Sequence, residues 1–154
     1  LFAESVRLDR RVVRPPSELA KLSGGYLRRH LDRRPAENPV DRFSERFARD
    51  LPLLEAEGLD FYHQWAFATI RQFGGAFEAL ALHLRWLESV SPLRLVLGEA
   101  AAEFDLIATA AKALILKGAR SVHSKRPFDP RASLQDVSSA WTRGVERLDR
   151  SLRN

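Results

Sequence analysis

The chain of 154 residues contains neither cysteine nor methionine. Without cysteine it can form no disulfide bond, bind no metal through a thiolate and use no thiolate as a nucleophile. Because methionine is missing even from the first position, we interpret the chain as part of a longer gene product. A secretory signal is also missing, since Glu4 and Arg7 interrupt the apolar residues at the start. We therefore expect a cytoplasmic protein.

Long apolar runs are missing too, and the nearest approach to one is the segment 60–89. Its apolar side chains, many of them aromatic, are spread around all sides of a helix. Such a helix is surrounded by other helices or lies in a membrane. Arg71, Glu78 and Arg85 interrupt the run well short of the ~20 apolar residues that a membrane span requires. The sequence thus predicts no membrane span and a helix in the centre of a bundle.

Apolar residues at helical spacing, in contrast, are abundant along the rest of the chain. They recur three and four positions apart in four further segments, 17–34, 38–58, 92–124 and 132–152. The loops between the segments are short, which favours neighbouring helices packed antiparallel. We therefore predict an all-α fold, a bundle of about five helices around the central apolar helix 60–89.

The first residues of the chain differ from the rest. Residues 1–8 are the only candidate strand, a short N-terminal edge strand that would belong to an upstream sheet. Pro15 and Pro16 follow and disfavour helix at that point. We accordingly divide the chain into 1–16, a basic connector or remnant strand, and 17–154, the helical bundle domain.

Several residues mark the expected ends of the helices. Ser17, Asn38 and Asp60 suit the N-cap position, where a side-chain oxygen accepts a hydrogen bond from a free backbone N–H. Pro39 fits the first helical position after Asn38. We expect Pro52 to kink or divide its helix, because proline removes one backbone hydrogen bond from the helix interior.

Positive charge is concentrated in the first 36 residues, which hold nine Lys and Arg against four acidic residues. The rest of the chain is neutral, so the net charge of +5 belongs to this part. Such a cluster attracts an acidic protein or nucleic acid, or it is a solvated face or the contact to a missing domain. The candidates for docking a partner are Arg28, Arg29, Arg33 and Arg34. Nucleic acid is the least favoured, because no helix-turn-helix or aromatic platform accompanies the charge.

Polar residues on the apolar helix and on the segment 105–112 form the second candidate site. The four histidines do not stand at the spacing of metal ligands, and we expect no metal, no cofactor and no catalytic residue. We expect the histidines of the apolar helix to be hydrogen bonded in the interior or at its rim. The members of the candidate polar pocket or buried network are His63, Arg71, Gln72, Glu78, Asp105 and Lys112. We favour an interior network of salt bridges among the four charged members, because a charge inside a bundle must be paired.

A distinctive pattern runs through the same region, with YHQWAFATIRQFG at 62–74 and LRWL at 84–87. RRHL at 28–31, FD at 104–105 and AKAL at 111–114 extend it. Together these motifs resemble the bacterial domain-of-unknown-function family 1839, and the resemblance covers most of the chain up to the last helix. It implies that this chain is the C-terminal half of a longer protein.

The resemblance implies more about the other half than about this one. The N-terminal half of the family is similar to papain-like, thiol-centred proteins, including acyltransferases that take an acyl group from a carrier protein. Any nucleophile then belongs to that half, and no active-site residue carries over to this chain. The resemblance only draws attention to His63, Arg71, Gln72, Asp105 and Lys112, which match polar positions of the family.

Three functions stay open at this point. The first is a helical domain with a supporting or interaction role in a larger bacterial protein, which meets an upstream domain or an acidic partner. The second is part of a carrier-protein-dependent acyl or aminoacyl transferase whose catalytic half lies outside this chain. The third is a nucleic-acid-binding module that uses the basic N-terminal quarter.

Overall fold

The computed structural model describes residues 5, 7–91, 96–126 and 128–153. These residues form helices and no strand, which confirms the predicted all-α fold. The elements are, in chain order, η1 (Leu8–Arg10), α1 (Pro16–Asp32), α2 (Pro39–Glu57), α3 (Leu59–Tyr62), η2 (His63–Phe67), α4 (Ala68–Val90), α5 (Gly98–Ser124) and α6 (Pro130–Arg153). The element η1 is a 3₁₀ turn, and η2 is a π-helical turn.

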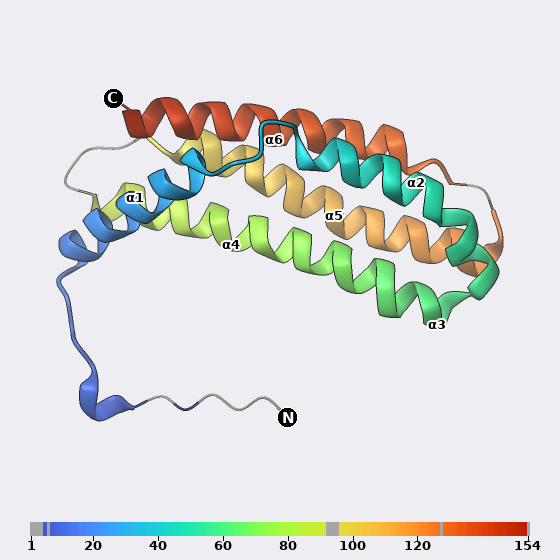
Figure 1. Cartoon of the computed structure of the whole chain (residues 1–154), viewed down its shortest axis with the longest axis horizontal. Coiled ribbons are helices and arrows are strands. Elements are labelled where there is room, and N and C mark those ends of the chain that lie inside the picture. The colour runs from blue at the N-terminus through green and yellow to red at the C-terminus, as the bar shows by residue number, and fades with distance from the viewer. Residues whose placement is uncertain (1–4, 6, 92–95, 127, 154) are drawn as a thin grey trace.

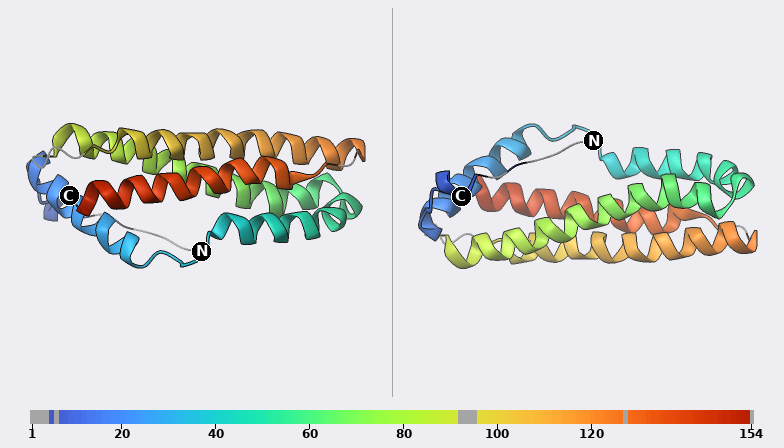
Figure 2. Two further views of the ribbon diagram at one scale, coloured as in Figure 1. Left: turned by 90° about the horizontal axis from the view of Figure 1, so that it is seen from above. Right: turned by 90° about the horizontal axis from the view of Figure 1, so that it is seen from below.

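Three long helices, α4, α5 and α6, run along the length of the bundle (Figure 1). The place of a fourth helix is shared by α1 and α2, which lie one after the other along the bundle (Figure 2). α1 packs against α4 and α6, whereas α2 packs mainly against α6. α5 lies between α4 and α6 and has the largest number of buried residues of any helix. α5 therefore contributes the most buried residues to the core, although its outer face is exposed, with Leu106 at 56% and Leu116 at 68%.

The segment 60–89 is helical throughout, as predicted, because α3, η2 and α4 follow one another without a break. Its surroundings differ from the prediction. One face is buried, with Ile70 and Leu84 fully inaccessible, but Trp65 and Leu82 on the other face are 61% and 63% exposed. Among the described helices, none has both the length and the apolar character of a membrane span. The exposed apolar residues of this helix therefore need an explanation other than burial inside the chain.

The start of α2 follows its sequence signals. Asn38 caps the helix, since its Oδ1 accepts a hydrogen bond from the backbone N–H of Val40 at 2.9 Å, and Pro39 takes the first helical position. Pro52 lies inside α2 without ending it, contrary to a division of the helix. The residue is exposed, so the carbonyl that loses its helical partner can bond to water instead.

Two other predicted N-caps are wrong. Ser17 lies inside α1, which begins at Pro16, because the missing N–H of proline has no intrahelical partner to lose at the first position. Asp60 lies in the first turn of α3, and Gly58 precedes that helix. Gly58 has φ +91°, a left-handed conformation that glycine adopts without steric cost because it has no Cβ.

Residues 7–15, before α1, form an arm that leaves the bundle (Figure 1). The predicted edge strand 1–8 falls mostly outside the described residues; of the rest, Ser5 and Arg7 are in no strand, and Leu8 begins η1. The described residues of the arm are all exposed, among them Val12 and Val13. The arm thus contributes nothing to the core.

The packing around α5 depends on two glycines that leave room for aromatic rings. A Cβ on Gly144 of α6 would lie 2.7 Å from Cε1 of Phe104, and a Cβ on Gly118 of α5 would clash with the ring of Tyr62. Both rings are almost completely buried. The Tyr62 hydroxyl donates a hydrogen bond to the carbonyl of Ile115 at 2.9 Å, and burial raises the pKa of Tyr62 to about 12. The bundle therefore has a tightly packed interior at these crossings.

Candidate functional site

A largely apolar groove of about 560 Å³ lies between α1 and α4, and we name it the α1–α4 groove. Its lining residues are Leu19, Leu22, Ser23, Tyr26, Leu27, His30, Leu80, His83 and Trp86. Tyr26 is 57% exposed, and Leu19, Leu22 and Trp86 are also accessible. Tyrosine and tryptophan are enriched at protein interfaces, because they bury much apolar surface and keep a polar atom for a hydrogen bond. The groove therefore has the side-chain chemistry of a protein-docking surface.

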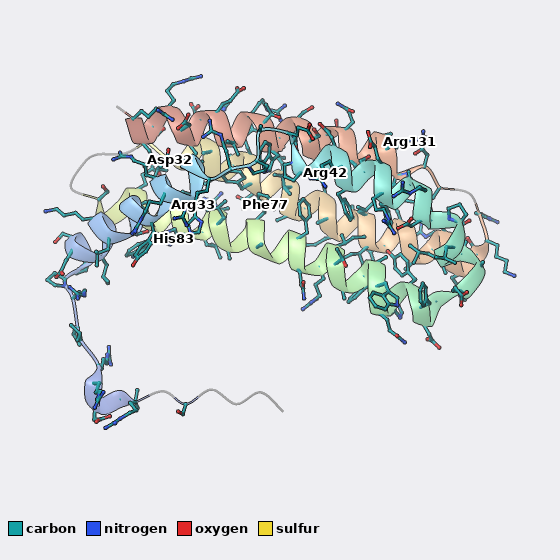
Figure 3. The ribbon with its side chains drawn as sticks, viewed as in Figure 1. Asp32, Arg33, Arg42, Phe77, His83 and Arg131 are labelled. Carbon is teal, nitrogen blue, oxygen red and sulfur yellow. The ribbon has the colours of Figure 1, made fainter. Side chains whose placement is uncertain are left out.

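His83 lies where α1 crosses α4 (Figure 3). Its Nε2 is 2.6 Å from the hydroxyl oxygen of Ser23, and its ring lies against that of Trp86, with the centroids 5.4 Å apart and the planes tilted by 32°. It is thus a hydrogen-bonded histidine at the rim of the bundle, as the sequence predicts. A serine activated by histidine needs a third group that orients the ring and free N–H groups that stabilise an oxyanion. Ser23 lies inside α1, where the backbone N–H groups are bonded within the helix, so we assign this pair a structural role.

The four arginines proposed for docking divide into two pairs. Arg28 donates a hydrogen bond to the carbonyl of Leu152 in α6, and Arg34 pairs with Asp149 of α6 at 3.4 Å. Arg28 thus fastens α1 to α6, and Arg34 fastens the chain just after α1 to the same helix. Arg29 lies over the ring of Tyr26, 4.5 Å from its centroid, and within the described part of the chain neither Arg29 nor Arg33 forms an ion pair.

The second candidate region is a hollow of about 320 Å³ between α4 and α5, the α4–α5 hollow. Its lining residues are Ile70, Arg71, Gly74, Gly75, Glu78, Ala111, Lys112 and Ile115. A Cβ on Gly74 would lie 2.8 Å from the Cβ of Ala111, so this glycine lets α4 and α5 approach closely. Three of the six predicted polar residues, Arg71, Glu78 and Lys112, therefore do line one hollow.

The predicted interior network of salt bridges is wrong. Lys112 pairs with Glu78 at 3.0 Å, and Asp105 pairs with Arg85, but these are two separate pairs with exposed side chains. Arg71 is exposed and takes part in no ion pair among the described residues. Because α4 lies at the surface of the bundle, its charged residues reach water and need no interior partner.

His63 and Gln72, the two remaining members, stay apart from the hollow. Both are exposed, and His63 stands in the π-helical turn with its ring 5.6 Å from that of Phe67. The described residues contain no group of three or more His, Asp or Glu side chains that is placed to hold a metal ion. His63 therefore joins an aromatic cluster at the end of the bundle instead of a polar site.

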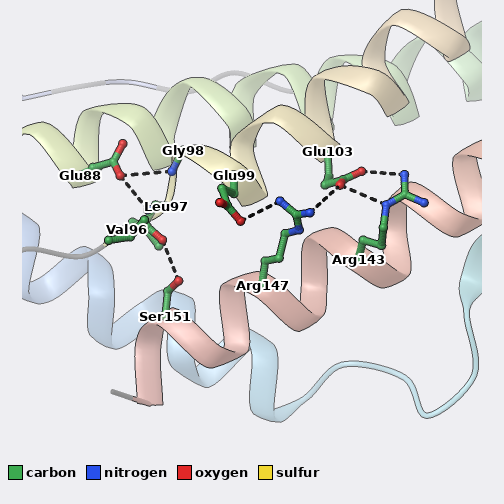
Figure 4. Close-up of polar contacts among 9 residues, drawn as sticks. All are labelled: Glu88, Val96, Leu97, Gly98, Glu99, Glu103, Arg143, Arg147 and Ser151. Atoms are coloured by element: carbon green, nitrogen blue, oxygen red, sulfur yellow. Dashed lines mark hydrogen bonds and ion pairs between the residues drawn. The ribbon is translucent and has the colours of Figure 1, made fainter.

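An ion pair with an almost buried carboxylate lies elsewhere in the described part of the chain, between α5 and α6 (Figure 4). Glu103, 8% exposed, accepts two hydrogen bonds from the guanidinium of Arg143, at 3.0 and 2.8 Å. Arg147 reaches Glu103 at 3.6 Å and Glu99 at 2.8 Å. The hydrogen bonds from Arg143 hold the pKa of Glu103 below its usual value, against the opposing effect of burial.

Sequence reasoning missed this cluster, although a signal is present. Glu99 and Glu103 are four residues apart on one helix, and Arg143 and Arg147 are four apart on another. Residues at this spacing share one face of a helix, so the two pairs form complementary stripes. The signal indicates that α5 and α6 are neighbours and points to packing, not to a site.

Comparison with known proteins places this arrangement in a family. The sequence model of the family described as the DUF1839 C-terminal domain matches residues 16–150. This range is the bundle from the first residue of α1 to the last turn of α6. No curated protein and no solved structure matches the chain.

Proposed function

We propose that this chain, which belongs to the DUF1839 C-terminal domain family, is a helical interaction domain that docks an acidic amphipathic helix of a partner protein in the α1–α4 groove. The observation that carries the proposal is the combination of an open apolar groove with unpaired positive charge beside it. The supporting evidence comes from the exposure of its lining, from the charges at its rim and from the scaffold beneath it.

The apolar lining supplies the attraction. Leu19, Leu22 and Tyr26 are 41%, 45% and 57% exposed, and they follow one another at the spacing of one helix face. Contiguous exposed apolar surface is uncommon on a monomer and marks a place where another molecule binds. Leu80 and Trp86 of α4 form the opposite wall, so an apolar helix face has side chains to contact on both sides.

The charges at the rim select the partner. Arg29 of α1 and Arg33 at the C-cap of that helix form no ion pair within the described residues, and Arg29 lies directly over the Tyr26 ring that lines the groove. Acidic residues on the flanks of a docked helix would pair with these cations. Complementary charge raises the rate of association and disfavours partners of the wrong sign more than it adds affinity.

The scaffold beneath the groove favours a docking role over a chemical one. Arg28 of α1 and Arg34 just after that helix both bond to α6, and Ser23 bonds to His83 across the groove. A surface held in this way is already ordered, so binding costs it little conformational entropy. The alternative function, part of a transferase, requires a nucleophile that would come from a separate half of the protein. The acidic partner would then be a carrier protein.

The experiment measures fluorescence anisotropy of labelled helical peptides titrated with the protein. The first peptide has leucine and phenylalanine on one face and glutamate on the other, and in the second lysine replaces the glutamate. We expect saturable binding of the acidic peptide and at least tenfold weaker binding of the basic one. Tyr26→Ala and Trp86→Ala should each weaken the acidic peptide at least tenfold, since aromatic anchors carry about 2 kcal/mol or more at interface centres.

Two matched controls accompany these variants. Trp65→Ala removes another exposed tryptophan of the same long helix, at a site outside the groove, and should leave binding unchanged. Arg29→Glu with Arg33→Glu should weaken the acidic peptide, whereas Arg120→Glu, an exposed position on α5, should not. Equal binding of both peptides, or an equal effect of Trp65→Ala, would refute the proposal. Binding of a DNA duplex that falls steeply with salt would favour the nucleic-acid module instead.

A further inference from the structure

The α4–α5 hollow is separate from the α1–α4 groove and has a different chemical character. Its floor is apolar, formed by Ile70, Gly74, Ala111 and Ile115, and its walls are charged. The volume of about 320 Å³ suits a small molecule and not a protein segment. The question is therefore which small molecule the charges and the floor would accept.

The charge of the hollow is positive by one unit. Lys112 and Glu78 compensate each other across the opening, with 3.0 Å between Nζ and the carboxylate oxygen. Arg71 lines the same hollow and pairs with no acidic residue among those the structure describes, whereas Arg85, the other arginine of α4, pairs with Asp105. A guanidinium presents several N–H donors in one plane, which matches the two oxygens of a carboxylate. A monoanion would neutralise the hollow, whereas a phosphate dianion would leave excess negative charge beside Glu78.

The apolar floor of the hollow indicates that the rest of the ligand is apolar. A Cβ on Gly75 would meet nothing within 4 Å, so the missing side chain leaves open space above α4. Ile70 and Ala111 are almost inaccessible to solvent and lie beneath the hollow, so an apolar tail would contact the exposed Gly75 and the half-buried Ile115. Apolar atoms placed there would be removed from water, which stabilises a complex by roughly 25 cal/mol per Å² of buried apolar surface.

We propose that the α4–α5 hollow binds a small monocarboxylate with a short apolar tail. The carboxylate pairs with Arg71 and approaches Lys112, and the tail lies on the floor beside Gly74 and Gly75. Glu78 sets the sign and the number of charges, because it cancels one of the two cations. The site requires no partner in the α1–α4 groove, so its test is independent of the docking proposal.

The test follows the backbone amide signals of Gly74 and Gly75 by nuclear magnetic resonance while hexanoate, acetate or inorganic phosphate is added to the whole chain. Hexanoate should shift both signals to saturation, acetate should bind more weakly because it lacks the tail, and phosphate should show no saturable shift. Arg71→Gln should weaken hexanoate roughly tenfold, the effect of losing one charge-assisted hydrogen bond at an accessible site. Glu78→Gln should strengthen it, because Lys112 is then free for the carboxylate.

Arg120→Gln is the matched control, since it also removes an exposed arginine without an ion pair in the described residues and lies outside the hollow. It should leave hexanoate binding unchanged. The proposal is overturned if Arg71→Gln and Arg120→Gln behave alike, if phosphate binds as tightly as hexanoate, or if Glu78→Gln weakens hexanoate. Arg71 is exposed and forms no ion pair among the described residues, so we expect the variant to stay folded, which its circular dichroism spectrum checks.

Discussion

Arg143→Gln tests the reasoning that an α5–α6 ion pair, and not the polar residues of α4, stabilises this bundle. The side chain of Glu103 is 10% exposed and receives both of its short hydrogen bonds from Arg143. Glutamine retains much of the side-chain length and removes the charge. The substitution therefore leaves a carboxylate that is almost buried with a single, more distant cation, Arg147 at 3.6 Å.

The expected loss of stability follows from the geometry. Removing one partner of a fully buried ion pair costs about 3–5 kcal/mol, because the other charge stays buried without compensation. Arg143 is itself 47% exposed and Arg147 remains, so water and the second arginine reduce the cost to about 1.5 kcal/mol. For a domain of this length that loss lowers the melting temperature by about 3–6 °C. The matched control is Arg150→Gln on the same helix, because Arg150 is exposed and forms no ion pair among the described residues.

The pH dependence provides a second measurement of the same pair. The hydrogen bonds from Arg143 lower the pKa of Glu103 in the folded chain. In the unfolded chain the pKa of a glutamate is about 4.3. A carboxylate with a depressed folded pKa contributes stability above its unfolded pKa, and that contribution disappears as pH falls through the folded pKa. The stability difference between the parent and Arg143→Gln should therefore be full near about pH 6 and shrink toward about pH 3.

Thermal unfolding followed by circular dichroism, with urea titrations at each pH, measures both quantities. The reasoning is refuted if Arg143→Gln melts with the parent and with Arg150→Gln. It is also refuted if the difference persists unchanged in acid, because the ionised form of Glu103 would then not be its source.

Three further stability measurements follow from the packing. Gly144→Ala should lower the melting temperature, because its Cβ would lie 2.7 Å from the buried Phe104 ring and overpacking costs about 1–3 kcal/mol. Gly25→Ala should raise the melting temperature, since its Cβ meets nothing within 4 Å in the middle of α1 and alanine is about 0.5–1 kcal/mol better there. Tyr62→Phe should cost about 0.5–1.5 kcal/mol at neutral pH by removing the hydrogen bond to Ile115. The parent should also lose stability as pH rises from about 10 toward 12, since the unfolded phenol ionises first, and Tyr62→Phe should lose less over that range.

The helices themselves could be predicted from the sequence because their signals are local. Apolar spacing placed α2, α6 and the long helix over 60–89 within a few residues of their observed bounds. Local signals failed at Ser17 and Asp60, where proline and glycine determine the start of the helix more strongly than a capping side chain does. Each failure concerns one turn and does not change the fold.

The sites were less predictable because they depend on which helices meet. Arg71, Glu78 and Lys112 line one hollow because α4 and α5 are consecutive long helices, but the predicted network does not form, since only Glu78 and Lys112 pair. The α1–α4 groove was not predicted, because Tyr26 and Trp86 are sixty residues apart and α1 has to cross α4 before they meet. The contacts of Arg28 and Arg34 with α6 were missed for the same reason, and both arginines were assigned to a partner.

The apolar side chains on several sides of α4 connect the predicted fold with the proposed docking site. A helix in a bundle of this kind needs one apolar face, and α4 has that face on α5. Two further apolar side chains of α4, Leu82 and Trp86, are 63% and 36% exposed, and Trp86 lines the α1–α4 groove beside His83. Exposed apolar surface of this kind is what a docked helix would cover. The feature that predicts a central position in the sequence therefore supports, once α4 is found at the surface, the proposed docking of a partner helix in that groove.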